Sequence, residues 1–245
     1  YVTGNDTYTA QWKKNTVDEE IIVTIKGDSD VVTYDGNSHE VSGYSVVSIT
    51  KDGEAFTEYT GNDFGLKSGV TAYASGKNAA TYPMGLSKDS FENKNEKFTN
   101  IKFVVTDGSL VIAQRAIEVK ANGGSKEYDG TALTATEKGY TIISGELVSG
   151  DEERVVLSGS ITSAGSEDAV VESVIIKNAN AVDVTKNYDI KTLKGELKVT
   201  ASKTPYTITV NGKSDTKEYN GQTQSVTGYD YATYDETITV SGPAQ

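Results

Sequence analysis

The side chains of this chain that are capable of chemistry are numerous carboxylates, many lysines and asparagines, and one histidine. The chain has 245 residues, with 35 acidic and 23 basic side chains and no cysteine. His39 cannot by itself supply the ligands of an ordinary zinc site or the partners of a Ser-His-Asp triad. We therefore expect His39 to be a surface residue.

Two aspartates, Asp28 and Asp30, have a spacing that suggests calcium binding. The matching positions in the internal repeats described below are Asn122 and Gly124, then Lys213 and Asp215. Because the acidic pattern does not recur and no calcium-loop spacing is present, a turn capped by side chains is the better interpretation. A glycosidase needs only two carboxylates, but no pair stands out. We expect no enzyme, no catalytic residue, no metal and no cofactor.

One covalent possibility stays open. Wall-attached immunoglobulin-like domains can join a lysine to an asparagine or aspartate side chain beside a buried carboxyl group, which strengthens a protein that lacks cysteine. This chain contains the residue types, but no motif selects a pair.

A tyrosine turn motif recurs three times. The copies are Tyr34-Asp35-Gly36, Tyr128-Asp129-Gly130 and Tyr219-Asn220-Gly221, spaced by about 90 residues. Asp-Gly and Asn-Gly are the dipeptides best suited to positive φ in a tight hairpin. Since asparagine replaces aspartate in the third copy, the motif serves backbone shape rather than carboxylate chemistry. The tyrosine ring is expected to pack at the end of a strand.

The motif belongs to a longer repeat. Each copy follows an alternating strand, at residues 21–25, 116–120 and 206–210, and precedes a Gly-Tyr pair, at Gly43-Tyr44, Gly139-Tyr140 and Gly228-Tyr229. Three features that recur in the same order indicate an array of like modules. Each module ends in a strand, a glycine turn and a closing strand, at residues 104–112 and 189–199.

The repeat defines the predicted domains. Module 1 spans 17–113, module 2 spans 114–203, and 204–245 is the truncated start of module 3, whereas 1–16 ends a preceding repeat. Only a few residues separate Ile112 from Ile117, and so short a junction favours a semi-rigid array.

Alternating apolar residues predict an all-β fold. Further strands are expected at 46–49, 101–105, 154–157, 170–176 and 236–240, with single helical turns at 13–20 and 86–91 and an ambiguous segment at 151–157. The preferred architecture is a tandem array of small immunoglobulin-like β-sandwiches in an elongated arrangement. The alternative is a β-grasp-like module with one short helix.

Several of these segments resemble a known family. The Lys-Glu-Tyr-Asp-Gly-Thr of 126–131, the Thr-Tyr-Pro-Met-Gly-Leu of 81–86, Asn187-Tyr188 and the Asp-Gly-Ser-Leu of 107–110 are similar to the YDG or MBG repeats of bacterial surface adhesins. The resemblance covers about 17–245. Module 2 departs from it, because Ala169-Val170-Val171-Glu172-Ser173 replaces the Tyr-Pro-Met-Gly-Leu stretch, so loop structure is expected to differ.

A second resemblance lies upstream. Residues Tyr8-Thr9-Ala10-Gln11-Trp12 look like the last strand of a Listeria–Bacteroides-type repeat of internalin-like surface proteins. Together the resemblances imply an extracellular location on a bacterial surface or cell wall, a stalk or adhesin role, and no agreed catalytic residue. Met84 is the only methionine, which suggests a piece of a longer protein.

Composition fits that expectation. A formal net charge of −12 repels phosphate backbones and anionic membranes, so no nucleic-acid partner is expected. No apolar run is long enough to span a bilayer, and the absence of cysteine leans towards export. The preferred function is a stalk that presents a distal binding head and whose partners are its neighbouring modules. The alternative is an adhesin that binds host glycan or matrix protein through exposed tyrosines, with candidates Tyr44, Tyr59, Tyr73, Tyr229 and Tyr231.

Overall fold

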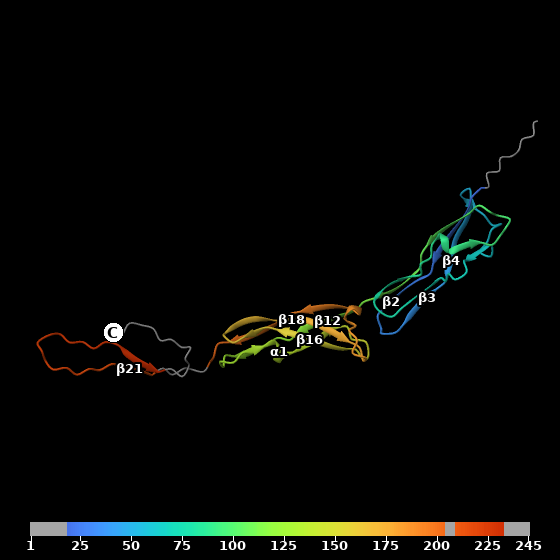
Figure 1. Cartoon of the computed structure of the whole chain (residues 1–245). Coiled ribbons are helices and arrows are strands. Elements are labelled where there is room, and N and C mark those ends of the chain that lie inside the picture. Colours follow the sequence, from blue (N-terminus) through green and yellow to red (C-terminus); the bar gives the residue numbers. More distant parts are fainter. Residues whose placement is uncertain (1–18, 204–208, 233–245) are drawn as a thin grey trace, which may run out of the picture. The chain divides into compact units, whose positions relative to one another are not determined.

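The computed structural model describes residues 19–203 and 209–232 (Figure 1). Its regular structure is almost entirely β-strand, which confirms the all-β class. The predicted helical turn at 13–20, the repeat end at 1–16 and the strand at 236–240 lie wholly or mostly outside the described residues, as does most of the strand at 206–210.

The chain divides into two compact units. The described part of the first unit holds residues 19–120, 140–156 and 171–193, and the second holds 121–139, 157–170, 194–203 and 209–232. The first unit therefore combines the predicted module 1 with two segments of module 2. The boundaries predicted at 113/114 and 203/204 remain predictions.

The first repeat consists of short strands. They are β1 (Ile21–Gly27), β2 (Ser29–Thr33), β3 (His39–Ser42), β4 (Tyr44–Lys51), β5 (Glu54–Ala55), β6 (Phe64–Leu66), β7 (Tyr73–Gly76), β8 (Ala80–Pro83), β9 (Phe91–Asn93), β10 (Ile101–Thr106) and β11 (Ser109–Ala113). They form sheets of order β10-β1-β4-β5 and β2-β11-β8, with two-stranded pairs β3-β7 and β6-β9. The strands predicted at 21–25, 46–49 and 101–105 are confirmed.

Period-2 alternation builds the core of this repeat. In β1, Ile21, Val23 and Ile25 are buried while the residues between them are only partly buried. Their side chains pack on an aromatic group, Tyr59, Phe64 and Phe91. Burial of apolar area stabilises the fold by about 25 cal/mol per Å², so this cluster is a main source of stability in the first repeat.

The predicted glycine turn between the two closing strands is wrong. β10 and β11 do not fold back on each other, because β10 pairs in parallel with β1 and β11 pairs in parallel with β2. At the break, a Cβ on Gly27 would collide with the backbone of Gly108. The glycines therefore permit close approach of two parallel backbones at a kink, rather than a reversal of the chain.

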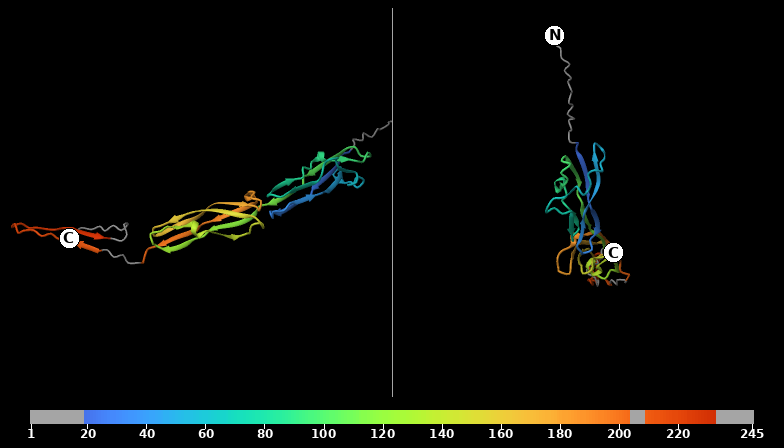
Figure 2. Two further views of the ribbon diagram at one scale, coloured as in Figure 1. Left: turned by 60° about the horizontal axis from the view of Figure 1, so that its bottom comes forward. Right: turned by 90° about the vertical axis from the view of Figure 1, so that its right-hand side faces the viewer.

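The second repeat is built in the same order. Its elements are β12 (Arg115–Ala121), β13 (Gly124–Glu127), β14 (Leu133–Thr134), α1 (Ala135–Lys138), β15 (Tyr140–Ser144), β16 (Glu152–Ser158), β17 (Ser160–Ile161), β18 (Gly165–Lys177), η2 (Thr185–Asn187), β19 (Tyr188–Leu193) and β20 (Gly195–Thr200). Again the opening strand has two parts, which pair in parallel with the two parts of the closing strand: β12 with β19, and β13 with β20. Figure 2 shows strands of this repeat running side by side.

The predictions for helical turns have mixed outcomes. A 3-10 turn, η1 (Lys88–Ser90), lies within the predicted turn at 86–91, with Ser87 as its N-cap. The ambiguous segment at 151–157 is mainly the strand β16, as its alternating side chains favour. The short helix α1 was not predicted; Thr134 caps it through a bond from the Glu137 N–H.

In the described part of the third repeat, the strands β21 (Thr209–Gly212) and β22 (Tyr229–Ala232) pair antiparallel. One backbone bond shows that the three repeats share local structure. It runs from Asp28 N to Gly43 O at 3.1 Å, from Asn122 N to Gly139 O at 3.0 Å, and from Lys213 N to Gly228 O at 3.1 Å. The Gly-Tyr pair seen in the sequence therefore marks the same corner each time.

Candidate functional site at the repeated turn

The three tyrosine motifs form the same turn. In each, the side-chain oxygen of the second residue accepts the backbone N–H two residues later, from Asn37 to Asp35 (2.9 Å), from Thr131 to Asp129 (2.9 Å) and from Gln222 to Asn220 (3.0 Å). The following glycines, Gly36, Gly130 and Gly221, have φ values of 79°, 83° and 76°. Aspartate and asparagine supply the same acceptor, and only glycine adopts this φ without strain.

In the first copy the turn also engages the single histidine. Asp35 Oδ1 lies 2.9 Å from His39 Nε2 and also accepts from Asn37. These bonds, that from His39 first, hold the pKa of the Asp35 carboxyl well below its usual range. His39 is half-buried and ties the turn to β3, a role that the expectation of a plain surface residue omits.

In the second copy a lysine replaces the histidine. Lys126 Nζ lies 2.7 Å from Asp129 Oδ1 and 2.6 Å from the Thr131 hydroxyl. The Lys126 bond, followed by those from Thr131, holds the pKa of Asp129 well below its usual range. In the first two copies the turn carboxylate is thus paired with a basic side chain. His39 lies four residues after Asp35, whereas Lys126 lies three residues before Asp129.

The tyrosines of the motif have different surroundings. Tyr34 is 2% exposed, whereas Tyr219 is 95% exposed. The Tyr34 ring packs edge-on against Tyr188, with centroids 5.6 Å apart and planes at 76°. A side chain on Gly36 would meet Val148 at 2.8 Å. Within the first unit, the turn of the first repeat is therefore covered by residues of the second.

Tyr188 is the centre of this junction cluster, which we define as Tyr34, Val148, Asp151, Asn187 and Tyr188. Its hydroxyl donates to Asp151 Oδ2 at 2.6 Å and accepts the Val148 N–H at 3.0 Å. Burial first, and then the bond to Asp151, raise the pKa of Tyr188 above its ordinary value of 10.0. Burial, with the nearby Asp151 and Asp35 charges, also raises the pKa of Tyr34 against the opposing effect of its bond with Asn187.

Asn187 is a buried polar residue that joins distant parts of the first unit. It is 4% exposed, and its Oδ1 accepts the Ala79 N–H at 2.8 Å. Its Nδ2 donates to Asn78 Oδ1 at 3.2 Å, and the side chain also bonds to Tyr34. Such a group is satisfied only while all its partners stay in place, so Asn187 couples the segments that it touches.

The junction cluster has the chemistry of a structural contact. It places phenols, an amide and one carboxylate in mutual hydrogen bonds, with no nucleophile beside a base. Among residues 19–203 and 209–232, no group of three or more acidic or histidine side chains is placed to hold a metal. Asp28 lies in the single-residue link between β1 and β2 and Asp30 lies within β2, so the turn predicted at these residues is wrong. Both aspartates are exposed, and Asp30 Oδ1 accepts the Val31 N–H at 2.8 Å.

The lysine crosslink considered from the sequence has no candidate pair in the described part of the chain. Such a bond needs a lysine beside a buried carboxyl group, but the buried polar residues there are Ser90 and Asn187. Across the described residues, no helix has the length and apolar character needed to cross a bilayer.

The tyrosines proposed for ligand binding do not form a common exposed set. Tyr59 is 1% exposed and lies in the core, and Tyr44 is half-buried against Phe91 with ring centroids 5.0 Å apart. Tyr229 is half-buried, whereas Tyr73 is 43% exposed and donates to Glu40 at 2.9 Å. Of these four tyrosines only Tyr73 is exposed, and the side chain of Tyr231 lies outside the described part of the chain.

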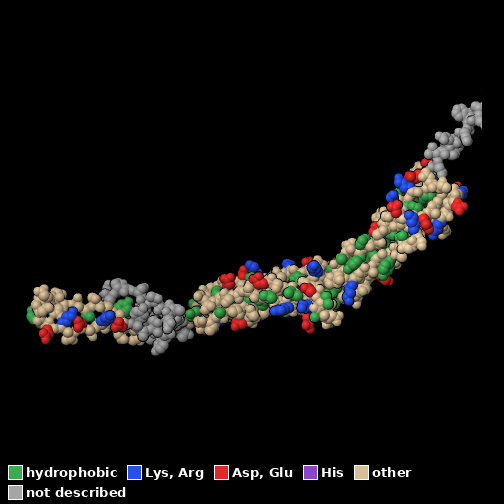
Figure 3. Space-filling model, in the orientation of Figure 1, with side chains coloured by type: hydrophobic (Ala, Val, Ile, Leu, Met, Phe, Trp, Pro, Cys, Tyr) green, Lys and Arg blue, Asp and Glu red, His purple; other side chains and the backbone are tan. Residues whose placement is uncertain are grey.

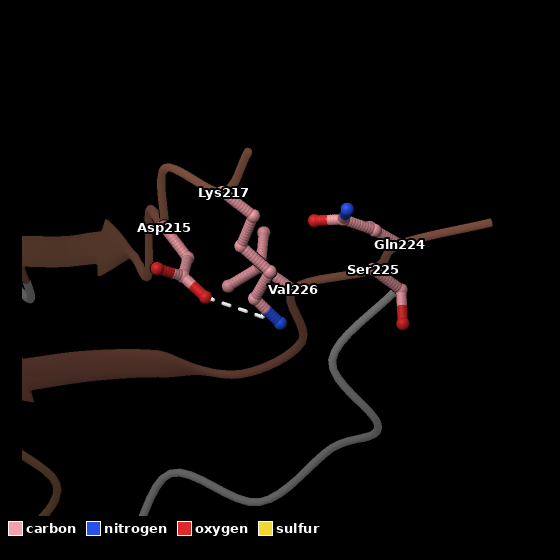
Figure 4. Close-up of a pocket in the computed structure, with 5 residues that line it drawn as sticks. All are labelled: Asp215, Lys217, Gln224, Ser225 and Val226. Atoms are coloured by element: carbon pink, nitrogen blue, oxygen red, sulfur yellow. Dashed lines mark ion pairs between the residues drawn. The ribbon is translucent and has the colours of Figure 1, made fainter. Parts of the chain in front are cut away.

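Two surface hollows are lined mainly by polar and charged residues. One, lined by Ser166, Glu167, Asp168 and Glu196, has Asp168 bonded to Lys194 Nζ at 2.7 Å. Another is formed by the segment between β21 and β22, where Asp215 faces Lys217 at 3.3 Å beside Val226 (Figure 4). On the face shown in Figure 3, acidic and basic side chains are interspersed.

The sequence predicts the three turns, but it does not predict which residues pack over the turn at Tyr34. Asn187 and Tyr188 stood out only as a motif pair, and nothing local distinguishes Val148 or Asp151. No known protein family, curated protein or solved structure matches the chain.

Proposed function

We propose that this chain is a non-enzymatic repeat region of a bacterial surface or cell-wall protein, in which successive modules brace one another as a stalk. The resemblance to adhesin repeats supports the assignment to a surface protein. Its partners are neighbouring modules of the same chain, and its location is extracellular.

The observation that carries this proposal is the burial of Asn187 against Ala79. A side chain of the second repeat accepts a backbone N–H of the first and reaches Tyr34 of the first turn. Leaving such a buried partner unsatisfied costs about 1–3 kcal/mol. A contact of this kind resists separation of the segments that it joins, which is what a stalk under tension requires.

The order of the strands favours one of the two module architectures expected from the sequence. In the first two repeats the opening strand pairs in parallel with the closing strand, β1 with β10 and β12 with β19, and β1 also pairs antiparallel with β4. This order favours the β-grasp-like alternative over the immunoglobulin-like sandwich, with η1 or α1 as the short helical element.

A second candidate function is adhesion through the modules themselves. Exposed apolar side chains on the first repeat support it: Val31 on β2 is 69% exposed and Val47 on β4 is 61% exposed. Exposed apolar residues are common on soluble proteins, so these residues favour a ligand-binding face only if they act together.

A binding screen distinguishes the two functions. The whole chain is immobilised and tested against mucin glycans and matrix proteins at physiological salt, beside Val31→Thr/Val47→Thr and Tyr73→Ala variants. The stalk proposal expects no saturable binding. Saturable binding to one ligand that either variant abolishes, while circular dichroism is unchanged, would replace the stalk with the adhesin.

A mechanical measurement tests the stalk directly. The chain is stretched between its ends in a single-molecule trap, and Asn187→Ala is compared with Asn180→Ala, an exposed asparagine of the same repeat. Asn187→Ala is expected to lower the force of the first unfolding event, whereas Asn180→Ala leaves it unchanged. Equal forces for the two variants would remove the basis of the proposal.

A further inference from the structure

The second and third tyrosine motifs differ at one chemically significant position. Residues 126–130 are Lys-Glu-Tyr-Asp-Gly and residues 217–221 are Lys-Glu-Tyr-Asn-Gly. An asparagine that precedes glycine is the type most prone to lose its amide, because glycine offers no side chain to hinder attack by its own backbone nitrogen. We propose that Asn220 is a spontaneous deamidation site whose aspartate product pairs with Lys217, as Asp129 pairs with Lys126.

The reaction needs only water. The backbone nitrogen of Gly221 attacks Cγ of Asn220 and loses its proton, a C–N bond forms, and the side-chain amide leaves as ammonia. The resulting succinimide ring is opened by water at one of its two carbonyls. Opening at one carbonyl gives aspartate, and opening at the other gives the β-linked isomer, with no change in oxidation state.

The surroundings of Asn220 leave room for this reaction. Asn220 and Gly221 are both exposed, and the preceding Tyr219 is 95% exposed. Among the described residues, nothing lies within 4 Å of the position that a Cβ on Gly221 would occupy. The bond from Gln222 N to Asn220 Oδ1, at 3.0 Å, holds the side-chain amide over the backbone that follows it.

The chain contains two other Asn-Gly pairs, which serve as internal comparisons. Asn122 Nδ2 donates to Lys138 O at 3.0 Å, and the next residue, Gly123, packs so closely that a Cβ would meet Glu196 O at 2.6 Å. Asn211 lies within β21 and is paired with Asp230. The side-chain amide of Asn122 is bonded and the backbone at Asn211 is paired within a strand, so both sites must open before ring closure, whereas Asn220 lies in an exposed turn.

The sequence supplies a cation near the product. Lys217 lies three residues before Asn220 in the sequence, and Lys126 lies three residues before Asp129. In that second copy the Lys126 Nζ lies 2.7 Å from Asp129 Oδ1. In the present structure Lys217 instead faces Asp215 at 3.3 Å (Figure 4). The α-linked aspartate keeps the acceptor of the turn and adds one negative charge, so this product changes the electrostatics while preserving the backbone shape, whereas the β-linked isomer adds a methylene to the main chain.

Peptide mapping tests the proposal, because cleavage after lysine places the three pairs in separate peptides, 121–126, 204–213 and 218–245. The intact chain is incubated at neutral pH and 37 °C, and the acid and β-linked forms of each peptide are measured over time. Asn220 is expected to convert roughly tenfold faster than Asn122, a factor that corresponds to ~1.4 kcal/mol in activation free energy.

Two comparisons make the result specific. In concentrated urea the rates should converge, because only the folded structure separates the sites, and Gly221→Ala should slow conversion at Asn220 in the folded chain. Conversion of Asn122 or Asn211 at the same rate as Asn220 in the folded chain would overturn the site assignment.

The pairing with Lys217 is tested on Asn220→Asp, which represents the product. Carboxyl NMR titration should give residue 220 a lower pKa in this variant than in Asn220→Asp/Lys217→Gln. Equal pKa values in the two proteins would show that no pair forms.

Discussion

The hydroxyl of Tyr188 donates to the Asp151 carboxylate at 2.6 Å and, at the same time, accepts the Val148 N–H at 3.0 Å. A backbone bond from Asp151 N to Val148 O, 2.9 Å long, closes the turn between those two residues. One phenol oxygen therefore holds both ends of the turn beside the start of β19, and its ring packs against Tyr34.

Tyr188→Phe should destabilise the chain by about 1–3 kcal/mol, because the change keeps the ring but leaves a backbone N–H and a carboxylate without their partner. Urea unfolding followed by circular dichroism measures the loss. Tyr73→Phe is the matched control, since its hydroxyl bonds Glu40 on the surface and should cost no more than ~0.5 kcal/mol. Equal losses would show that the junction cluster contributes little.

Gly36→Ala should be more destabilising than Gly130→Ala. Both positions have positive φ, so alanine costs each turn roughly 1–2 kcal/mol. At Gly36 the new methyl would also meet Val148 at 2.8 Å, whereas no described atom lies within 4 Å at Gly130. Overpacking adds about 1–3 kcal/mol, and the difference between the two urea midpoints measures it. A larger loss for Gly130→Ala would contradict the placement of the first turn.

Ionisation of the Tyr59 hydroxyl at alkaline pH should lower the free energy of unfolding. Burial first, and then the Asp63 charge, raise the pKa of Tyr59 from 10.0 to about 12. Because the folded pKa is the higher one, its contribution is complete below pH 10 and is lost as the pH rises from 10 towards about 12. The slope is at most ~1.4 kcal/mol per pH unit for this group.

Unfolding free energies measured between pH 9 and 12 check the Tyr59 prediction. Tyr59→Phe should lower stability at neutral pH, since it loses the bond to Asn93, but should flatten the alkaline slope. Tyr73→Phe should leave that slope unchanged. The prediction fails if the unfolding free energy of Tyr59→Phe decreases with pH as steeply as that of the unmodified chain.

The second turn should respond to acid. Lys126 and Thr131 hold the pKa of Asp129 below its ordinary value of 3.8. The folded pKa is the lower one, so the contribution of this carboxylate is present above pH 3.8 and is lost as the pH falls through its folded pKa. Lys126→Gln should raise the Asp129 pKa measured by carboxyl NMR, whereas Lys191→Gln, which removes a pair with Glu118, should not.

Local chemistry accounts for what could be predicted. The alternation of Ile21, Val23 and Ile25 indicated a half-buried strand, because side chains on a strand point to opposite faces whatever the rest of the fold. The turn could be predicted for the same reason, since its acceptor and its glycine lie within a few residues of each other. The pattern at β16 is ambiguous and no prediction covers the helix α1, because short segments carry little periodicity.

The glycines at the kink show where a local pattern misleads. Gly108 between two strands is typical of a reversal, yet the chain continues, because β10 and β11 find separate parallel partners in β1 and β2. The partner strands lie about 80 residues away in sequence, so no local pattern contains the information.

By itself the sequence determined the all-β class, the repeat and the conformation of its turn, since each depends on neighbouring residues. The tertiary structure alone decided which turn is buried. Tyr34 and Tyr219 occupy equivalent positions, yet one is 2% and the other 95% exposed. Burial depends on the atoms that arrive from elsewhere in the chain, and for Tyr34 these come from Asn187 and Tyr188.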